Sequence, residues 1–331
     1  MTLEDLIGAR LVVGFPETEA TEALIEQLQA LHVQSLIVFD RNFQSPEQFV
    51  RLLRRLEEGV GHPLLVMVDH EGGRVVRFAS GVTRFPDALS VGRTQGPEAV
   101  ERQGMTEAEE LKQLGVSVNL APCVDVLVEG SDPVIGNRSY GSDPAQVATL
   151  SLARIRGLQS RGVAACAKHF PGLGAVPRDP HKRLPTISLG WKAMEQIHLV
   201  PFRAAVEAGV ATVMSSHVCY PGLGEPDGLP ATFSPRLIQR VLRERMGFQG
   251  LILTDDLEMG ALRAFGSMGE VAIRATEAGH DLLLICSDLS KAHEVSSVLR
   301  NSYQQDRLNT SELEASAERL FRLTQKYCPP P

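Results

Sequence analysis

The amino-acid sequence predicts a single-domain α/β fold, a (β/α)8 barrel of the TIM type, and three observations lead to it. Eight short apolar runs alternate with longer amphipathic runs along the 331 residues, the pattern of repeated strand–helix units around a parallel sheet. The apolar runs are almost continuous in Val, Ile, Leu and Ala, as strands buried on both faces need to be. Neither a GxGxxG motif nor a P-loop motif follows any of these runs, so an open, nucleotide-binding sheet is disfavoured.

The expected strands are the apolar runs themselves, each ending where polar residues begin. In chain order they cover residues 9–15, 34–40, 63–69, 116–122, 163–170, 211–217, 250–256 and 280–286. The runs between them predict helices, among them 45–59, 143–162, 190–209 and 234–247. Several of these helices open with Ser-Pro or Asp-Pro and end in Gly, which are start and stop signals. A last helix at about 310–327 packs outside the barrel, and residues 1–331 are expected to form one catalytic domain.

Composition and charge narrow the class of ligand. The chain is 43% hydrophobic with a net charge of −7, which excludes disorder and gives no reason to bind nucleic acid or an anionic membrane. No apolar segment approaches the roughly 18 to 20 residues that span a bilayer. The first residues carry acids where a secretory signal carries bases, and the five cysteines are an odd number without metal-type spacing. We expect a cytoplasmic protein with reduced thiols and a small polar ligand.

Ionisable residues stand at the ends of many apolar runs. In a barrel those ends form one face, where the loops that follow the strands build the active site. For one position alone, a polar loop residue is an equally good explanation, but buried strand ends rarely carry so many ionisable groups without a use. The residues concerned are Asp40, Asp69, Lys168, His169, His217, Asp255 and Asp256.

The segment HFPGLGAVPRDPH, residues 169–181, is rich in Gly and Pro and ends in an acid two residues before a histidine. On an irregular loop, Asp179 can hold the imidazole of His181 and stabilise its cation, which suits proton transfer near neutral pH. From these residues alone, a polar turn with a surface histidine is the simpler reading.

Five segments of the chain resemble the single-domain bacterial β-N-acetylhexosaminidases of glycoside hydrolase family 3. They are VDHEGGRVVRF, VIGNRSYG, KHFPGLGAVPRDPH, ATFSPRLIQRVLRERMGFQG and GFQGLILTDDLEMGAL, and they run in family order over most of the chain. The resemblance implies a barrel that removes terminal β-linked N-acetylglucosamine with retention, through a covalent glycosyl-enzyme and without metal or cofactor. Members of this kind commonly act on cell-wall fragments, so peptidoglycan recycling is the expected role.

The resemblance also implies roles for particular residues. The first acid of the TDDLEM segment, Asp255, is the nucleophile, and Asp256 is its structural neighbour. His181 is the acid/base, with Asp179 as its partner. The residues implied to bind the sugar next to the bond being cut are Asp69, Arg77, Arg138, Lys168 and His169.

Two positions depart from the family pattern, and both lie in the loop that carries the acid/base pair. Leu173 stands where relatives commonly have histidine, and Pro180 stands between Asp179 and His181. Pro180 favours an extended backbone at Asp179 and stiffens the pair. Neither change removes a member of the pair, so activity is expected.

Other functions remain open from the sequence. One is a β-glycosidase of different sugar specificity, and another is a phosphorylase, because a histidine acid/base does not repel phosphate as a carboxylate does. A third is a barrel that binds sugar without turning it over. A metal-dependent hydrolase is less favoured, since no HxH or HExxH pair is present. The sequence leaves the oligomeric state open, and a monomer is compatible with it.

Overall fold

The computed structural model describes residues 1–131, 133–177 and 184–328, and it confirms the predicted barrel. Eight parallel strands pair in the order β7-β6-β5-β4-β3-β2-β1-β8. A parallel bridge between Leu253 and Leu282 brings the two outer strands together, so the barrel is nearly closed. The strands are β1 Leu11–Val13, β2 Ser35–Val38, β3 Leu65–Val68, β4 Val118–Asn119, β5 Ala164–Phe170, β6 Thr212–Ser215, β7 Leu251–Leu253 and β8 Leu283–Ile285.

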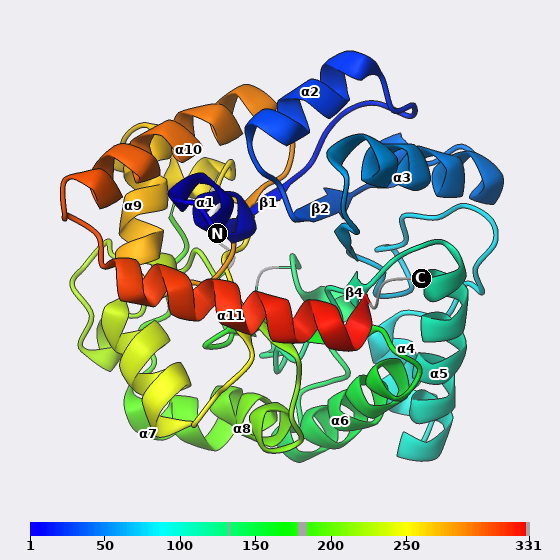
Figure 1. Ribbon diagram of the computed structural model, residues 1–331. Coiled ribbons are helices and arrows are strands. Elements are labelled where there is room, and N and C mark those ends of the chain that lie inside the picture. Colours follow the sequence, from blue (N-terminus) through cyan, green and yellow to red (C-terminus); the bar gives the residue numbers. More distant parts are fainter. Residues whose placement is uncertain (132, 178–183, 329–331) are drawn as a thin grey trace.

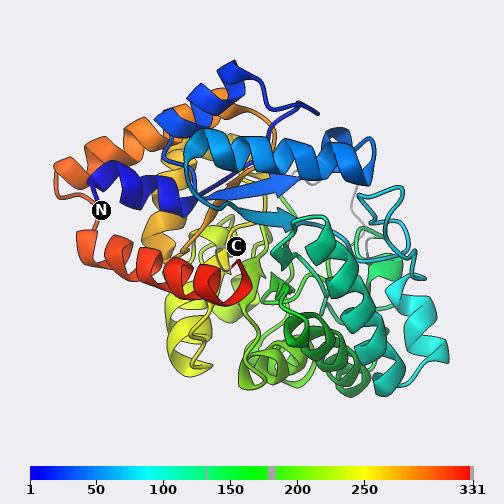
Figure 2. The ribbon, with the colours of Figure 1, turned by 45° about the vertical axis from the view of Figure 1, so that its right-hand side comes forward.

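Helices surround the strands in both views (Figure 1, Figure 2). The α-helices are α1 Leu3–Arg10, α2 Glu22–Ala30, α3 Pro46–Val60, α4 Ala88–Thr94, α5 Pro97–Gln113, α6 Pro144–Ser160, α7 Trp191–Ala193, α8 Leu199–Glu207, α9 Met268–Ala278, α10 Leu289–Gln304 and α11 Thr310–Tyr327. Two π-helical segments are η3 Met194–His198 and η6 Arg236–Arg245. Short 3-10 turns are η1 Asp40–Asn42, η2 Gly136–Arg138, η4 Pro221–Leu223, η5 Ala231–Phe233 and η7 Gly260–Phe265.

The helix start signals act as the sequence predicts. Ser45 accepts a hydrogen bond from the Gln48 N–H at the start of α3, and Asp143 does the same for Ala145 at the start of α6. Each is followed by a proline in the first turn, where a missing N–H costs nothing. Gly61, with φ of +82°, ends α3 in the left-handed conformation that glycine adopts readily.

The helix predicted over 190–209 is present over 191–207, but it contains a π-helical segment. The structure divides it into α7, the π-helical η3 and α8. The physical reason is Pro201, whose ring clashes with the carbonyl four residues earlier, that of Ile197 in η3. A locally widened turn accommodates that clash. The predicted helix is therefore confirmed, with a local widening that the sequence analysis did not include.

The core has two layers. Strand side chains that point outward pack against the helices, while those that point inward fill the barrel. Leu320, Leu323 and Tyr327 of α11 join the inner cluster, and the red α11 crosses the middle of the helical ring in Figure 1. The Cys328 thiol meets the Leu64 carbonyl just before β3, so α11 covers the amino-terminal end of the barrel. The carboxyl ends of the strands are thus the face left for a site. Among the described residues, no helix is long and apolar enough to cross a membrane.

Candidate active site

A pocket of about 530 Å³ lies at the carboxyl ends of the strands. Every predicted site residue in the described part of the chain lines it, namely Asp69, Arg77, Arg138, Lys168, His169 and Asp255. Glu71, His217 and Asp256 complete its charged and polar lining, and apolar walls come from residues including Phe39, Val134, Leu173, Val218 and Met259. Asp40 was expected at the site with the other strand-end residues, but it is exposed in η1, and its neighbour Phe39 lines the pocket instead.

Four charged side chains form a continuous cluster on the pocket floor. The Lys168 ammonium, 1% exposed, lies 2.6 Å from an Asp69 oxygen and 2.7 Å from a Glu71 oxygen. The Arg138 guanidinium donates to both Glu71 oxygens, at 2.8 and 2.7 Å. A buried charge persists only when it is paired in this way. The cluster therefore presents fixed donors and acceptors to the pocket.

The cluster sets the charge states of its members. Burial alone would lower the pKa of Lys168, but the carboxylates of Asp69 and Glu71 raise it above its usual range. Burial alone would raise the pKa of Glu71, but Lys168 and Arg138 hold it well below its usual range. Both side chains are consequently charged over the pH range in which proteins are stable.

Arg77 is held over the pocket by backbone and side-chain contacts. One Nη lies 3.8 Å from an Asp69 oxygen, and the guanidinium stands over the Phe39 ring. The Arg77 N–H approaches Nδ1 of His70 at 3.4 Å. Burial and the nearby positive charge of Arg154 and Arg77 lower the pKa of His70 to about 4, so that nitrogen is free to accept. Arg77 and Asp69 keep 27% and 20% exposure, which leaves both able to meet a ligand.

Arg74 lies close to Glu71 in the sequence but has other partners. It donates to the carbonyls of Pro133 and Val134, at 3.0 and 2.7 Å. Arg74 thereby anchors the segment ahead of Arg138.

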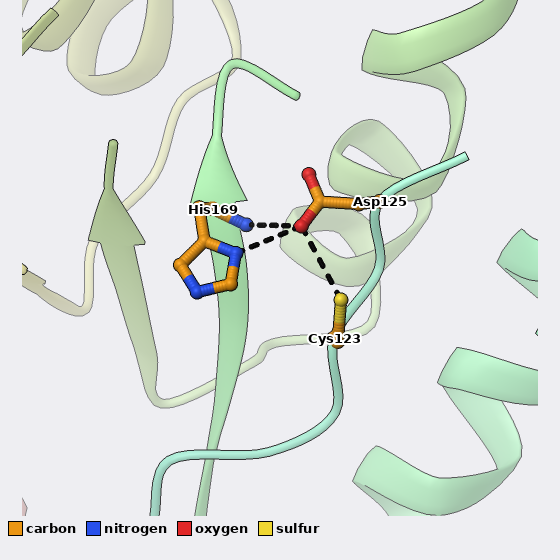
Figure 3. Close-up of side chains that lie close together, drawn as sticks. All are labelled: Cys123, Asp125 and His169. Atoms are coloured by element: carbon orange, nitrogen blue, oxygen red, sulfur yellow. Dashed lines mark hydrogen bonds and ion pairs between the residues drawn. The ribbon is translucent and has the colours of Figure 1, made fainter. Parts of the chain in front are cut away.

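His169 is oriented by a buried carboxylate that the sequence reasoning missed. Asp125 Oδ2 accepts from the His169 backbone N–H at 3.1 Å and meets Nδ1 of its ring at 2.8 Å (Figure 3). Since a carboxylate only accepts, Nδ1 carries the proton and Nε2 is the atom turned to the pocket, 3.4 Å from Arg138. The other Asp125 oxygen accepts from the Leu173 N–H. One carboxylate thus fixes both the ring and the start of the following loop.

Cys123, Asp125 and His169 offer donor atoms that all lie within 4.8 Å of one another, a grouping that resembles a metal site. In Figure 3 the carboxylate lies between the thiol and the imidazole. Burial raises the pKa of Cys123, so its thiol keeps a proton, and it donates to Asp125 at 3.3 Å. The carboxylate already accepts four donors here. The arrangement fits a hydrogen-bonded support better than a metal cradle.

Asp255 reaches the pocket from the end of β7. One of its oxygens accepts from the Asp256 N–H at 2.8 Å. Burial alone would raise the pKa of Asp255, but positive charge on His217 and His169 lowers it below the ordinary value. Lys168 acts in the same direction. The carboxylate is therefore ionised and available as a nucleophile.

Asp256 is a structural neighbour of Asp255 that holds the turn after β7. It accepts from the Glu258 N–H at 3.0 Å and from the Cys286 N–H at 3.4 Å, which ties the turn after β7 to the end of β8. The helical turn η7 begins only at Gly260. Burial raises the pKa of Asp256, in contrast to Asp255.

Asp179 and His181 lie outside the described residues, as does Pro180. The chain on either side of them is described, and Val176 and Pro185 both line the pocket. Leu173, the other departure, also lines it. The loop that carries the predicted acid/base therefore leaves and rejoins the described structure at the pocket wall.

Comparison with known proteins places the chain among sugar-cleaving enzymes. A family model described as "Glycosyl hydrolase family 3 N terminal domain" matches residues 2–323. A Beta-hexosaminidase of Nitrosomonas eutropha is 38% identical over 310 residues, which cover 92% of this chain and 87% of that protein. A Beta-hexosaminidase of Neisseria meningitidis is 39% identical over 294 residues, covering 87% and 80%.

Solved structures agree with this. A glycoside hydrolase family 3 β-N-acetylglucosaminidase from Paenibacillus superposes with a TM-score of 0.95 at 35% identity, over 99% of this chain and 63% of that one. NagZ from Neisseria gonorrhoeae in complex with N-trifluoroacetyl-D-glucosamine has a TM-score of 0.78 at 32% identity, over 94% of this chain and 97% of that one.

Proposed function

The chain belongs to glycosyl hydrolase family 3, and from this premise we propose that it is a retaining exo-β-N-acetylglucosaminidase. As a member of this family it is a glycoside hydrolase. The sugar specificity is supported by relatives that are named β-hexosaminidase and by the solved β-N-acetylglucosaminidases. The observation that carries the proposal is Asp255, a carboxylate with a lowered pKa in a pocket of paired polar side chains.

Asp255 supplies the nucleophile in this proposal. An oxygen of its carboxylate forms a bond to the anomeric carbon while the glycosidic C–O bond breaks, which gives a covalent glycosyl-enzyme. Water then attacks the same carbon, the ester bond to Asp255 breaks, and the configuration is retained. The attack requires the ionised form, which the surrounding positive charge favours.

His181 moves the proton in both steps. It donates to the leaving glycosidic oxygen in the first step and takes a proton from water in the second, with Asp179 stabilising the imidazolium. These two roles rest on the sequence resemblance. They are supported by Val176 and Pro185, described residues on either side of the segment, which line the pocket.

The charged cluster suits the hydroxyl groups of a sugar. Asp69 accepts hydrogen bonds, Lys168 and Arg77 donate them, and the Nε2 atom of His169 faces the same space. Because Asp69 pairs with Lys168 and Arg77, and Glu71 holds Lys168 from the other side, little ordering remains to be done when the sugar binds. We assign Asp69, Arg77, Arg138, Lys168 and His169 to this binding site.

Substrates derived from the cell wall and a cytoplasmic location are parts of the same proposal. All five cysteines are unpaired and four are buried, which suits a reducing compartment. We also propose that residues 1–331 act as one catalytic domain, since the pocket is built from strands along the whole barrel.

A slow fluorinated N-acetylglucosaminyl donor tests the proposal. Mass spectrometry after incubation and proteolysis is expected to find the sugar on the peptide that contains Asp255, and Asp255→Ala is expected to remain unlabelled. Labelling of any other residue contradicts the assignment. Assays with aryl β-glucosides and aryl β-xylosides in parallel test the sugar specificity, and product analysis with and without phosphate tests phosphorolysis.

A further inference from the structure

His217 lies within a chain of three hydrogen bonds beside the turn that carries Asp255, and two of the three bonds are buried. Its Nε2 lies 2.9 Å from the Asp256 carbonyl oxygen, and its Nδ1 lies 2.6 Å from the Thr232 hydroxyl. The Thr232 hydroxyl in turn donates to the Ser216 carbonyl at 3.0 Å. His217 is 4% exposed, Thr232 is fully buried and Ser216 is 1% exposed. The Thr232 end of this chain is therefore closed to bulk water, while the bond to Asp256 is part-buried.

The two ends of the chain determine how many protons it needs. Both ends are carbonyl oxygens, which accept and never donate. Three hydrogen bonds between two acceptors require three hydrogens. The Thr232 hydroxyl supplies one hydrogen, and a neutral imidazole supplies a second. One of the three hydrogen bonds then has no hydrogen. Only an imidazole with protons on both nitrogens satisfies the whole chain.

His280 provides a contrast in the same barrel. Its Nδ1 meets the Ala275 carbonyl at 3.0 Å, and its Nε2 meets the Ser215 hydroxyl at 2.8 Å. This hydroxyl can donate, so a neutral imidazole satisfies both bonds. Burial lowers the pKa of His280 to about 4, which agrees with the neutral form. Each histidine thus contacts one carbonyl and one hydroxyl. The two differ because the Thr232 hydroxyl already donates its hydrogen to the Ser216 carbonyl, whereas the Ser215 hydroxyl can donate to His280.

A buried imidazolium needs a negative partner, and the pocket provides one. Asp255, after β7, is a carboxylate whose pKa is lowered by charge at His217 more than by any other neighbouring group. The other titratable groups around His217 and Asp255 are His280 before β8, Asp256 in the same turn as Asp255, and the β5 pair Lys168 and His169.

We infer that His217 is a positioning residue that carries two ring protons, holds the turn of the nucleophile through the Asp256 carbonyl, and balances the charge of Asp255. This rests on the proposed role of Asp255. When the ester bond of the glycosyl-enzyme breaks, its electron pair returns to the Asp255 carboxylate beside a positive charge. His217 therefore favours hydrolysis of the intermediate more than its formation.

Proton-detected correlation of the imidazole nitrogens in the full-length 15N-labelled chain tests the charge directly. The His217 signals are assigned by their loss in His217→Gln. At pH 7 both ring nitrogens are expected to have imidazolium shifts. Thr232→Val removes the committed hydroxyl and is expected to give one unprotonated nitrogen, whereas Thr232→Ser keeps the hydroxyl and both protons. An unprotonated His217 nitrogen in the unaltered chain at pH 7 overturns the inference.

Pre-steady-state kinetics with an aryl N-acetylglucosaminide of good leaving group tests the consequence. Thr232→Val and His217→Gln are expected to slow hydrolysis of the glycosyl-enzyme relative to its formation on the order of tenfold. The acidic limb of kcat/KM is expected to move to higher pH. Equal loss in both steps with an unmoved acidic limb indicates a merely structural role and overturns the inference. If the unaltered chain does not turn over this substrate, the proposed function fails, while the nitrogen shifts still decide the state of His217.

Discussion

Lys168 and His169 show how far individual residues could be predicted. Their place at a strand end follows from the sequence, but neighbouring strand residues normally face opposite sides. The pairing of β5 with β6 shifts register between Lys168 and Phe170, and such a bulge redirects side chains so that both residues line the pocket. Nothing in the apolar pattern signals this shift. Asp125 was missed as well, although it follows the fourth apolar run and the strand-end argument applies to it.

Asp125 is expected to matter through His169. Asp125→Asn replaces the carboxylate with an amide, which has only one accepting oxygen. It cannot accept from all the donors that now contact Asp125, so the position of the proton on the His169 ring is no longer fixed. An unsatisfied buried group costs about 1–3 kcal/mol, and a cost of that size in the transition state lowers kcat/KM by roughly 5- to 150-fold. Steady-state kinetics with an aryl N-acetylglucosaminide measures it.

Cys123→Ser is the matched control for that variant, since a hydroxyl continues to donate to Asp125. Its kcat/KM is expected to stay close to that of the unaltered chain. Equal kinetics for Asp125→Asn and Cys123→Ser would show that His169 does not depend on this carboxylate.

Glu71 is expected to make stability depend on pH. Its pKa is lower in the folded chain than in the unfolded chain, so its contribution is present above the unfolded value, about 4.3, and is lost as pH falls toward the folded value. Glu71→Gln removes this pH-dependent contribution. It also leaves Lys168 and Arg138 without one of their negative partners, which lowers the free energy of unfolding by roughly 3–5 kcal/mol at pH 7. Between pH 7 and pH 3, Tm is expected to fall further for the unaltered chain than for Glu71→Gln.

Glu107→Gln is the comparison for that measurement. Glu107 pairs with Arg154 at 2.6 Å and is equally buried, but it does not line the pocket. Its loss is expected to lower Tm at pH 7 without raising KM, whereas Glu71→Gln is expected to do both. Parallel Tm-against-pH curves for Glu71→Gln and the unaltered chain would contradict the role given to Glu71.

At the scale of elements, most strands and helices follow from periodicity and capping, and the exceptions have local causes. Most strands were predicted one to three residues too long at an end, because each apolar run continues past the last hydrogen bond between strands, and the end of β5 at Phe170 was predicted correctly. The π-helical segment η3 depends on Pro201, which lies inside an otherwise helical pattern. Helix η6 is π-helical over Arg236–Arg245, and nothing in its sequence explains this.

The loop after β5 is expected to be sensitive to a single methyl group. A Cβ at Gly174 would lie 1.9 Å from the Val126 carbonyl oxygen, so Gly174→Ala must displace the segment that runs to the pocket wall. Such overpacking costs about 1–3 kcal/mol. We expect lower Tm and lower kcat/KM, measured by thermal unfolding and steady-state assay.

Gly260→Ala is its control, because a Cβ there meets nothing within 4 Å and Gly260 adjoins the same pocket. Its Tm and kcat/KM are expected to stay near those of the unaltered chain. Unchanged kinetics in Gly174→Ala would mean that the close approach to Val126 does not govern the loop.

At the scale of the whole molecule, the alternation of apolar and amphipathic runs was sufficient to predict the barrel and the face that bears the site. It was not sufficient to predict what covers the other end. That end depends on long-range ion pairs, since Asp281 just before β8 accepts from Arg243 at 2.5 Å and lies 2.7 Å from Arg319 of α11. Such pairs leave no local sequence signal.

Asp281→Asn is expected to lower stability without altering catalysis. Breaking these buried pairs costs roughly 3–5 kcal/mol, and the residue lies at the amino-terminal end of the barrel, opposite the pocket. Calorimetry is expected to show a lower Tm, with KM for the folded enzyme at 25 °C unchanged. A raised KM would show that the two ends of the barrel are coupled.

The α11 side chains that fill the amino-terminal end of the barrel have a consequence for turnover. Within the described structure, the pocket and α11 occupy opposite ends, so ligands enter and depart on the pocket side. In the proposed reaction the group released first is then the outer one, and the monosaccharide leaves last. The free sugar is accordingly expected to compete with substrate for the resting enzyme.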